Sequence, residues 1–119
     1  MAYIEGFLLA VPEAKLDAYR RIARKAGKVW MEYGALQYLE SVADDVQPGT
    51  QVSFERAVKC KPGEVVLMSY ILYRSRAHRD RVNKQVMADP RIAAMTGPDT
   101  CPFDPKRMMW GGFKSIVAF

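Results

Sequence analysis

Residues 64–87 read Glu-Val-Val-Leu-Met-Ser-Tyr-Ile-Leu-Tyr-Arg-Ser-Arg-Ala-His-Arg-Asp-Arg-Val-Asn-Lys-Gln-Val-Met, and this stretch decides the fold. Its first half is rich in β-branched and aromatic residues, with apolar side chains on both faces, which predicts a strand buried on both sides. Ser75 then supplies a hydroxyl suited to a helix N-cap, and His78 falls in the first turn of the helix that follows. The segment is therefore a strand that leads directly into a helix.

The N-terminal part of the chain predicts two more strands and a long helix. Residues 3–11 alternate as a strand that ends at Pro12, with the small stripe Ile4-Gly6-Leu8-Ala10 on the face expected to receive a helix. Residues 13–33 carry apolar side chains at steps of three and four, as in an amphipathic helix, and Gly34 is its expected stop. A second strand is expected at 35–43.

The remaining segments are shorter and less regular. Residues 52–58 are expected to form a short extended segment. Pro90 either ends the second helix or begins a further short turn through residues 91–95. A proline-rich loop then leads to a last strand at 108–119, which contains the pair Gly111-Gly112.

The order strand, helix, strand, strand, helix, strand predicts a ferredoxin-like α+β sandwich over a single domain, residues 1–119. In this fold a four-stranded antiparallel sheet carries its two main helices on one face. The other face would expose many large apolar side chains. We therefore expect a homodimer in which two sheets face each other and form a dimeric α/β barrel.

Composition excludes several classes of protein. No apolar run approaches the roughly 20 residues that span a bilayer, and the first ten residues contain a Glu but no basic segment of a signal peptide. Cys60 and Cys101 are expected to be reduced thiols, which favours a cytoplasmic location. One histidine and two distant cysteines give no metal-site spacing, and no nucleophile-elbow motif is present. We expect no metal and no cofactor.

His78 is the first candidate for a functional residue. It shares a helix face with Val82 and Val86, so the imidazole is expected on or beside the face that packs against the sheet. The helix N-terminus and burial both disfavour the imidazolium form. A neutral His78 can act as a base or bind a ligand, or it can simply hold the helix to a loop carbonyl.

Glu5 is the second candidate, because it is a carboxylate in an otherwise apolar strand. We expect it to point into the barrel and to pair with Arg74, Arg107 or Lys114. It is then either a catalytic acid or base or a member of an internal ion pair.

A third group of candidates would bind a ligand around His78. Asp104 and Arg107 lie on the proline-rich loop, where charge can be held over a pocket mouth. Arg79 flanks the helix N-terminus, and Trp110 is expected to line the pocket. Free N–H groups and a positive dipole end at that N-terminus favour a small anionic or carbonyl-bearing ligand.

Three segments resemble a known family. They are Tyr3-Ile4-Glu5-Gly6-Phe7, the run Ser-Arg-Ala-His-Arg-Asp-Arg-Val-Asn at 75–83, and Pro-Phe-Asp-Pro-Lys-Arg-Met at 102–108 followed by Gly-Gly-Phe at 111–113. The chain is similar over nearly its whole length to the YbaA-like family of small bacterial proteins, a domain of unknown function. The resemblance implies a dimeric α/β barrel and implies no activity.

Three interpretations of function stay open. The favoured one is a small-molecule barrel that binds, or also transforms, its ligand, so whether the chain is an enzyme is left undecided. The second is a nucleic-acid or polyanion binder, since the chain has a formal charge of +5 and a basic cluster from Arg74 to Lys84. That cluster lacks the aromatic platform of common RNA-binding sheets. The third is a structural or interaction dimer.

Overall fold

The structure, a computed structural model, describes residues 2–97 and 100–119. Its main strands and helices follow the predicted order, with shorter helices added between them. The elements are β1 (Tyr3–Pro12), η1 (Glu13–Lys15), α1 (Leu16–Glu32), β2 (Gln37–Val42), α2 (Phe54–Ala57), β3 (Glu64–Tyr73), α3 (Arg76–Met87), α4 (Pro90–Met95), η2 (Pro105–Arg107) and β4 (Met109–Lys114).

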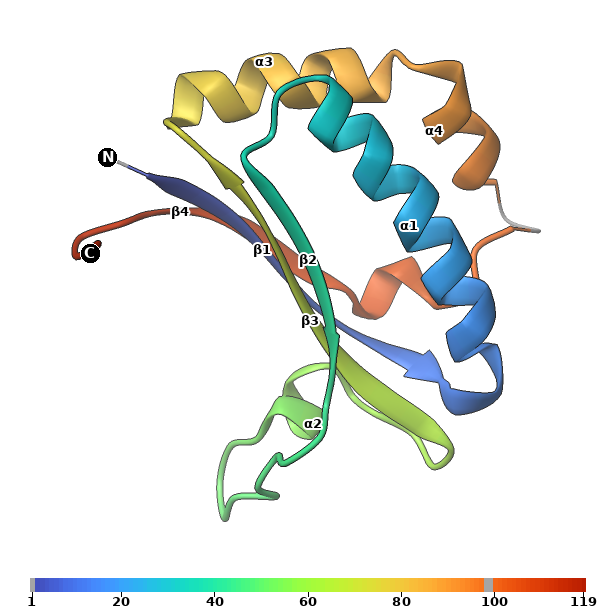
Figure 1. Cartoon of the computed structure of the whole chain (residues 1–119). Coiled ribbons are helices and arrows are strands. Elements are labelled where there is room, and N and C mark those ends of the chain that lie inside the picture. The colour runs from blue at the N-terminus through green and yellow to red at the C-terminus, as the bar shows by residue number, and fades with distance from the viewer. Residues whose placement is uncertain (1, 98–99) are drawn as a thin grey trace.

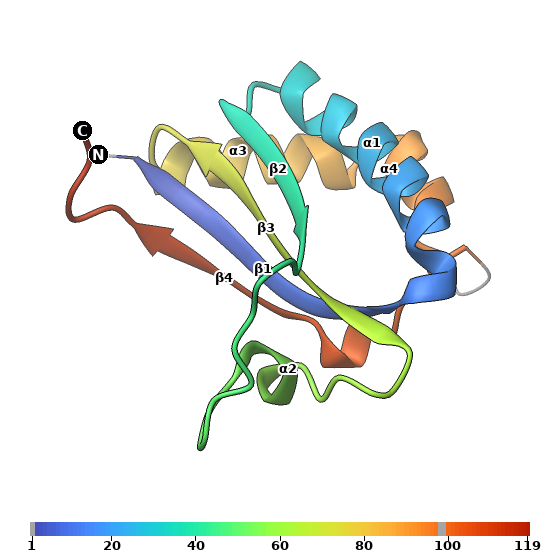
Figure 2. The ribbon, with the colours of Figure 1, turned by 60° about the horizontal axis from the view of Figure 1, so that its bottom comes forward.

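The described strands form a four-stranded antiparallel sheet in the order β2-β3-β1-β4. The two central strands are β1 and β3, and α1 and α3 each connect one strand to the next across the same face. Figures 1 and 2 show α1, α3 and α4 together on this face of the sheet. This arrangement confirms the predicted ferredoxin-like α+β fold.

The residues predicted at the helix ends have the expected roles. The Ser75 hydroxyl accepts a hydrogen bond from the His78 backbone N–H at 3.1 Å and so caps α3. Gly34 follows α1 with φ of 110°, a left-handed value that is costly for residues with a Cβ. The helix predicted over 13–33 is divided, because its first turn is the 3-10 helix η1 and α1 begins at Leu16.

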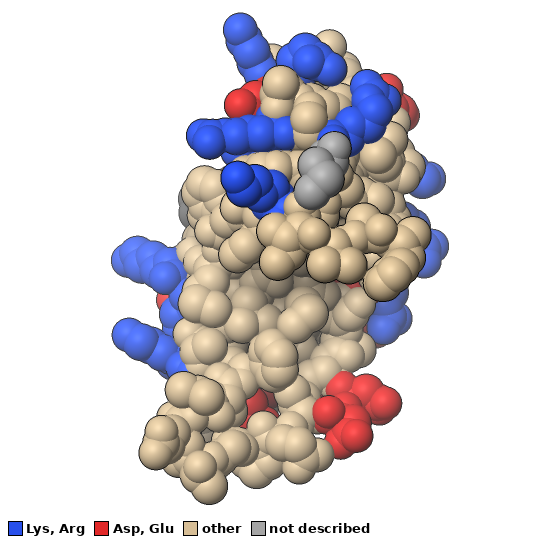
Figure 3. All heavy atoms as spheres, turned by 90° about the vertical axis from the view of Figure 1, so that its left-hand side faces the viewer, with Lys and Arg blue, Asp and Glu red and all other residues tan. Residues whose placement is uncertain are grey.

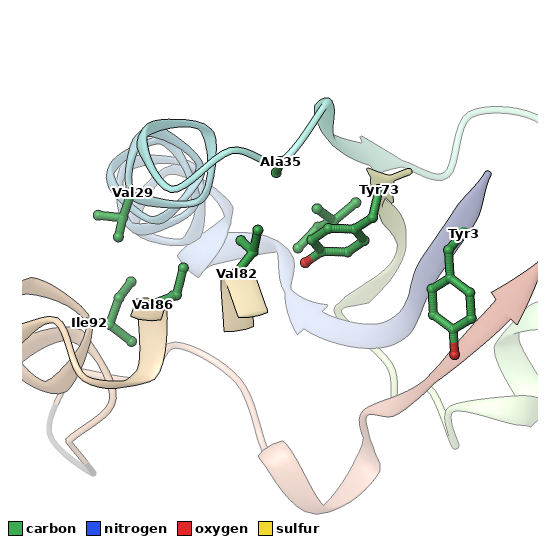
Figure 4. Packing of buried hydrophobic residues seen from close by; sticks show 8 residues of the cluster. Tyr3, Val29, Ala35, Tyr73, Val82, Val86 and Ile92 are labelled. Atoms are coloured by element: carbon green, nitrogen blue, oxygen red, sulfur yellow. The ribbon is translucent and has the colours of Figure 1, made fainter. Parts of the chain in front are cut away.

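The main core lies between the sheet and the helices. Figure 4 shows Val29 of α1, Val86 of α3 and Ile92 of α4 converging where these three helices meet. The face of α3 that was predicted to pack downward, His78, Val82 and Val86, is buried. Packing of this apolar face, more than the helix propensity of the sequence, is what stabilises a helix of this length.

The two faces of β1 are the reverse of our expectation. Glu5 faces the helices, where it meets Arg79 and Asn83 of α3, and the stripe Ile4-Gly6-Leu8-Ala10 faces away from them. The prediction that Glu5 points into a barrel between two sheets is therefore wrong. The physical reason is that α3 offers the carboxylate polar partners, while the larger Leu9 and Val11 fill the space beneath α1.

Two irregular segments also differ from the prediction. Residues 52–58, expected to be extended, contain the short helix α2, because the Ser53 hydroxyl accepts a hydrogen bond from the Arg56 N–H at 3.1 Å and caps it. The last strand is shorter than expected and ends at Lys114. Pro90 begins the short helix α4, one of the two outcomes that the sequence allowed.

The side of the sheet away from the helices is largely apolar, and we call it the open face. Val58, which follows α2, covers Ala10 and Val66 at one end of it. Figure 3 views the molecule from the left of Figure 1, away from α1 and α4. Uncharged residues form the middle of this view, with Lys and Arg toward its upper end and sides. The other large apolar side chains of the open face are Ile4, Leu8, Leu39, Met68, Tyr70, Leu72, Met109 and Phe113.

Two further observations concern the predicted state of the cysteines and the search for membrane-spanning segments. Cys60 and Cys101 are free thiols. Among the described residues, no helix combines the length and the apolar character that crossing a membrane requires.

Candidate functional site

A cavity of about 920 Å³ lies between the helices and the sheet. It is lined by residues of β1, β2 and β3, of α1, α3 and α4, and of the segment from Cys101 to Trp110. The lining is mainly apolar, and its size suits a small organic ligand. Its aromatic side chains include Phe7, Tyr19, Trp30, Tyr38, Phe103 and Trp110.

Few of the described residues that line the cavity are charged, and those that are charged are acidic. In the described part of the chain, the charged residues that line the cavity are Glu5 and Glu40, and no Lys, Arg or His reaches its surface. The two carboxylates come from different strands, β1 and β2. They therefore give the cavity two separate acidic positions, which differ in their surroundings.

The first of these, Glu5, is only 4% exposed and is held by α3. One carboxylate oxygen accepts a hydrogen bond from Arg79, with which it forms an ion pair, and the other accepts one from Asn83 Nδ2 at 3.0 Å. Arg79 also lies over the Tyr3 ring, 5.1 Å from its centroid, a favourable cation–π position. Arg79 therefore compensates the charge of Glu5. The predicted partners were Arg74, Arg107 and Lys114, and this part of the prediction is wrong.

Asn83 connects Glu5 to two aromatic residues. Its Oδ1 accepts hydrogen bonds from Trp30 Nε1 at 3.1 Å and from the Tyr73 hydroxyl at 3.0 Å. Burial, and then the charge of Glu5, raise the pKa of Tyr73, so that this phenol stays protonated and keeps donating. One side chain therefore fixes α1, α3, β1 and β3 relative to one another at the cavity wall.

The second acidic position is Glu40, which two tyrosines hold. The Tyr19 hydroxyl donates to Oε1 at 2.8 Å and the Tyr38 hydroxyl donates to Oε2 at 2.7 Å. Burial, followed by the charge of Glu40, raises the pKa of both tyrosines above the usual 10.0. Gly27 of α1 makes room for this arrangement, because a Cβ there would lie 2.8 Å from the Tyr38 ring.

On the other side of this cluster lies a second depression, of about 760 Å³, which we call the outer groove. It runs between α1 and β2, and it shares Tyr19, Ala23, Tyr38 and Glu40 with the cavity. Unlike the cavity, it is bordered by the exposed basic side chains of Arg20, Arg24 and Lys28. A single layer of side chains, Glu40 among them, thus separates the cavity from a groove that carries these three basic residues and Glu32.

The structure places His78 away from the cavity. Its Nδ1 accepts a hydrogen bond from the Arg74 backbone N–H at 3.0 Å, and its ring packs edge-on against Tyr73. The other ring nitrogen faces the backbone of Gly34, at the end of α1. His78 therefore joins the β3–α3 junction to the α1–β2 turn, and it does not line the cavity.

Replacing His78 by Asn tests this role, because Asn Oδ1 can accept where Nδ1 does while the titrating ring is lost. Burial, with Arg74 and Arg81 nearby, lowers the pKa of His78 below the ordinary 6.5. The unfolded chain therefore binds the proton more readily, so stability contributed by neutral His78 is present above pH 6.5 and falls as the pH drops below it. We expect urea unfolding of His78→Asn to show a smaller loss of stability between neutral and mildly acidic pH. An unchanged pH dependence would contradict the assignment.

Arg107 and Asp104 belong to a structural contact beside the cavity. The Arg107 guanidinium donates two hydrogen bonds of 2.7 Å to Glu64 at the start of β3, and this lowers the pKa of Glu64 to about 2. Asp104 caps η2 by accepting from the Lys106 N–H at 3.0 Å. The candidates are therefore divided: Glu5 and Trp110 line the cavity, Arg79 supports Glu5 from behind, and His78, Asp104 and Arg107 lie outside the lining.

Sequence reasoning missed Asn83, Glu40, Tyr19, Tyr38 and Trp30. A partial signal exists for Asn83, which is four residues after Arg79 and therefore on the same side of α3. Glu40 lies two residues after Tyr38 on β2, so both side chains point to the helix side of the sheet. No group of three or more His, Cys, Asp or Glu residues suited to a metal ion is found within residues 2–97 and 100–119.

Comparison with known proteins identifies the family. Residues 2–105 match the family described as "Protein of unknown function (DUF1428)". The chain belongs to this family. It is 44% identical over 117 residues to the uncharacterized protein YbaA of Escherichia coli K12, covering 98% of each chain, and the YbaA of Shigella flexneri matches to the same extent. The resemblance to the YbaA-like family is thereby confirmed.

Among solved structures, an uncharacterized NIPSNAP domain protein from Burkholderia xenovorans is similar to this chain in fold. The TM-score is 0.58 at 14% sequence identity, over 97% of this chain and 95% of the other. At this level of identity the similarity concerns the fold alone, and it agrees with the ferredoxin-like arrangement described above.

Proposed function

We propose that this protein binds a small, largely apolar organic molecule in the cavity between its helices and its sheet. The observation that carries the proposal is the cavity itself, about 920 Å³ in volume, rich in aromatic side chains and with only Glu5 and Glu40 as charged lining residues among those described. Ligand sites in proteins have this character, an apolar wall with a few fixed polar groups.

The polar groups on the wall restrict the kind of ligand. An anionic ligand, predicted from the N-terminus of the helix after Ser75, finds no basic side chain in the described lining, where α3 contributes Asn83 and Met87. A carbonyl-bearing molecule is better supported, because the buried Ser69 hydroxyl faces the cavity and can donate a hydrogen bond. Hydrogen-bond donors on the ligand are served by the two carboxylates.

A homodimer is part of the proposal. The open face presents large apolar side chains, among them Met68, 49% exposed, and Phe113, 65% exposed. Contiguous apolar surface on this scale commonly marks a protein interface. A second copy of the chain, placed sheet against sheet, would bury these residues and form the barrel expected from the sequence.

The nucleic-acid alternative has weaker support. Arg79, one of five basic residues in its cluster, is turned inward to Glu5, whereas Arg74, Arg76, Arg81 and Lys84 are exposed. The exposed ones remain suited to weak, salt-dependent attraction to polyanions.

A cavity-filling variant tests the proposed function. Ala26 of α1 lines the cavity, so Ala26→Leu adds three carbon atoms where a ligand would lie. We expect compounds that raise the melting temperature of the parent protein in a ligand screen to lose at least tenfold in affinity for this variant. Ala94→Leu, the same change at an exposed position of α4 outside the lining, is the matched control and should bind as the parent does.

Two results would contradict the proposed binding site. If no compound of a diverse small-molecule library binds the parent protein, the ligand-binding function is contradicted and a structural or interaction dimer is favoured. If hits bind Ala26→Leu as well as they bind Ala94→Leu, the binding site lies elsewhere.

A further inference from the structure

The two carboxylates in the cavity differ in how their charge is compensated. Glu5 has Arg79 as a fixed ion-pair partner. Glu40 is half-buried and forms no ion pair with any residue in the described part of the chain; its hydrogen-bond partners are the neutral hydroxyls of Tyr19 and Tyr38. The negative charge of Glu40 is therefore the one that a bound molecule can neutralise.

The tyrosines strengthen this asymmetry. Both hydroxyls are already donating to Glu40, and burial keeps both phenols protonated. Each carboxylate oxygen accepts one hydrogen bond and keeps further acceptor capacity. A ligand that reaches this end of the cavity thus meets acceptors held in place, and no basic side chain among the described lining residues.

Aromatic faces adjoin the same end. The rings of Trp30 and Tyr38 lie with centroids 6.0 Å apart and planes inclined by 38°, and both residues line the cavity. Aromatic faces attract ammonium groups through the ring quadrupole, most strongly when water is excluded. The carboxylate and the rings therefore favour the same chemical group.

We propose that the ligand is an organic cation, a protonated amine on an aromatic or aliphatic body, whose ammonium group binds to Glu40 between Tyr19 and Tyr38. The inference rests on the proposed function, since it assigns a chemical class to the ligand of the same cavity. The basic residues of the outer groove, Arg20, Arg24 and Lys28, lie on the other side of this cluster. They favour anions outside the wall, which makes the charge preference of binding a direct test.

Three probes that share a phenylethyl body and differ in their polar group separate the possibilities: 2-phenylethylamine, 2-phenylethanol and 3-phenylpropanoate. Binding is measured by two-dimensional NMR titration of the parent protein and of Glu40→Gln, which keeps one hydrogen-bond acceptor for the tyrosines. We expect the amine to bind the parent at least about tenfold more tightly than the alcohol, as a charged hydrogen bond adds on the order of 1.4 kcal/mol or more. In Glu40→Gln most of this preference should be lost, leaving at most the smaller contribution of the aromatic rings.

Glu55→Gln, which removes one exposed carboxylate from α2, controls for the change in net charge and should keep the preference of the parent. The inference is overturned if 3-phenylpropanoate binds most tightly, or if the preference for the amine is undiminished in Glu40→Gln. Either result leaves the cavity as a binding site. Failure of all three probes together with the whole ligand screen would instead remove the proposed function, and this inference with it.

Discussion

The Arg79→Met variant is expected to have a free energy of unfolding about 3 kcal/mol lower than that of the parent protein. The substitution keeps much of the apolar stem but removes the guanidinium that pairs with Glu5. Glu5, which is 4% exposed in the parent protein, would then keep Asn83 as its remaining polar contact among the described residues. Breaking one side of a buried ion pair is costly because the partner charge loses its compensation in a medium that solvates it poorly.

Urea unfolding of three variants measures this effect. Arg76→Met removes an exposed arginine from the same helix and should change the unfolding free energy by less than about 0.5 kcal/mol. Glu5→Leu combined with Arg79→Met removes both charges and should recover most of the loss, because a buried pair is often replaceable by apolar residues of similar size. An Arg79→Met variant as stable as Arg76→Met would show that Glu5 is not held by this pair.

Met68→Lys is expected to convert the proposed homodimer into a monomer. Met68 lies on β3 in the open face, where it pairs in register with Leu8 of β1 and Ser41 of β2. A lysine can extend into water in the isolated subunit, but between two sheets it would be buried without a partner. The dissociation constant should rise by at least about a thousandfold, equivalent to about 4 kcal/mol.

Sedimentation at micromolar concentration checks this result. The parent should sediment at twice the chain mass of 13.5 kDa and Met68→Lys at the chain mass. Val52→Lys, at an exposed position just before α2 and outside the open face, should sediment as the parent does. A parent protein that sediments at 13.5 kDa would contradict the proposed dimer.

The parts of the fold that were predicted correctly depend on short-range signals. Ser75 acts on an N–H three residues away, and Gly34 acts through its own backbone conformation. Apolar periodicity in 64–87 distinguished a strand from a helix within one segment. The short helix α2 was missed because its cap, Ser53, competes with an alternating pattern too short to decide between strand and helix.

The candidate site was harder to predict, because it is assembled from distant residues. Glu5 and Arg79 are 74 positions apart, and Tyr19 and Glu40 are 21 apart. Both faces of β1 are apolar enough to be buried, so the strand alone does not show which face the helices cover. The choice depends on α3, whose Arg79 and Asn83 can satisfy a carboxylate only on the helix side. The prediction was therefore centred on His78, the single histidine of the chain, which does not line the cavity.

The two tryptophans of the chain, Trp30 and Trp110, both line the cavity. One is tied by its indole N–H to Asn83 at 3.1 Å, and the other is 66% exposed at the start of β4. Emission from the protected indole and from the solvated indole should differ in wavelength and in susceptibility to quenchers. The tryptophan fluorescence of this protein, excited beyond the absorption of its tyrosines, consequently comes from residues that line the cavity, and it can report occupancy without any label.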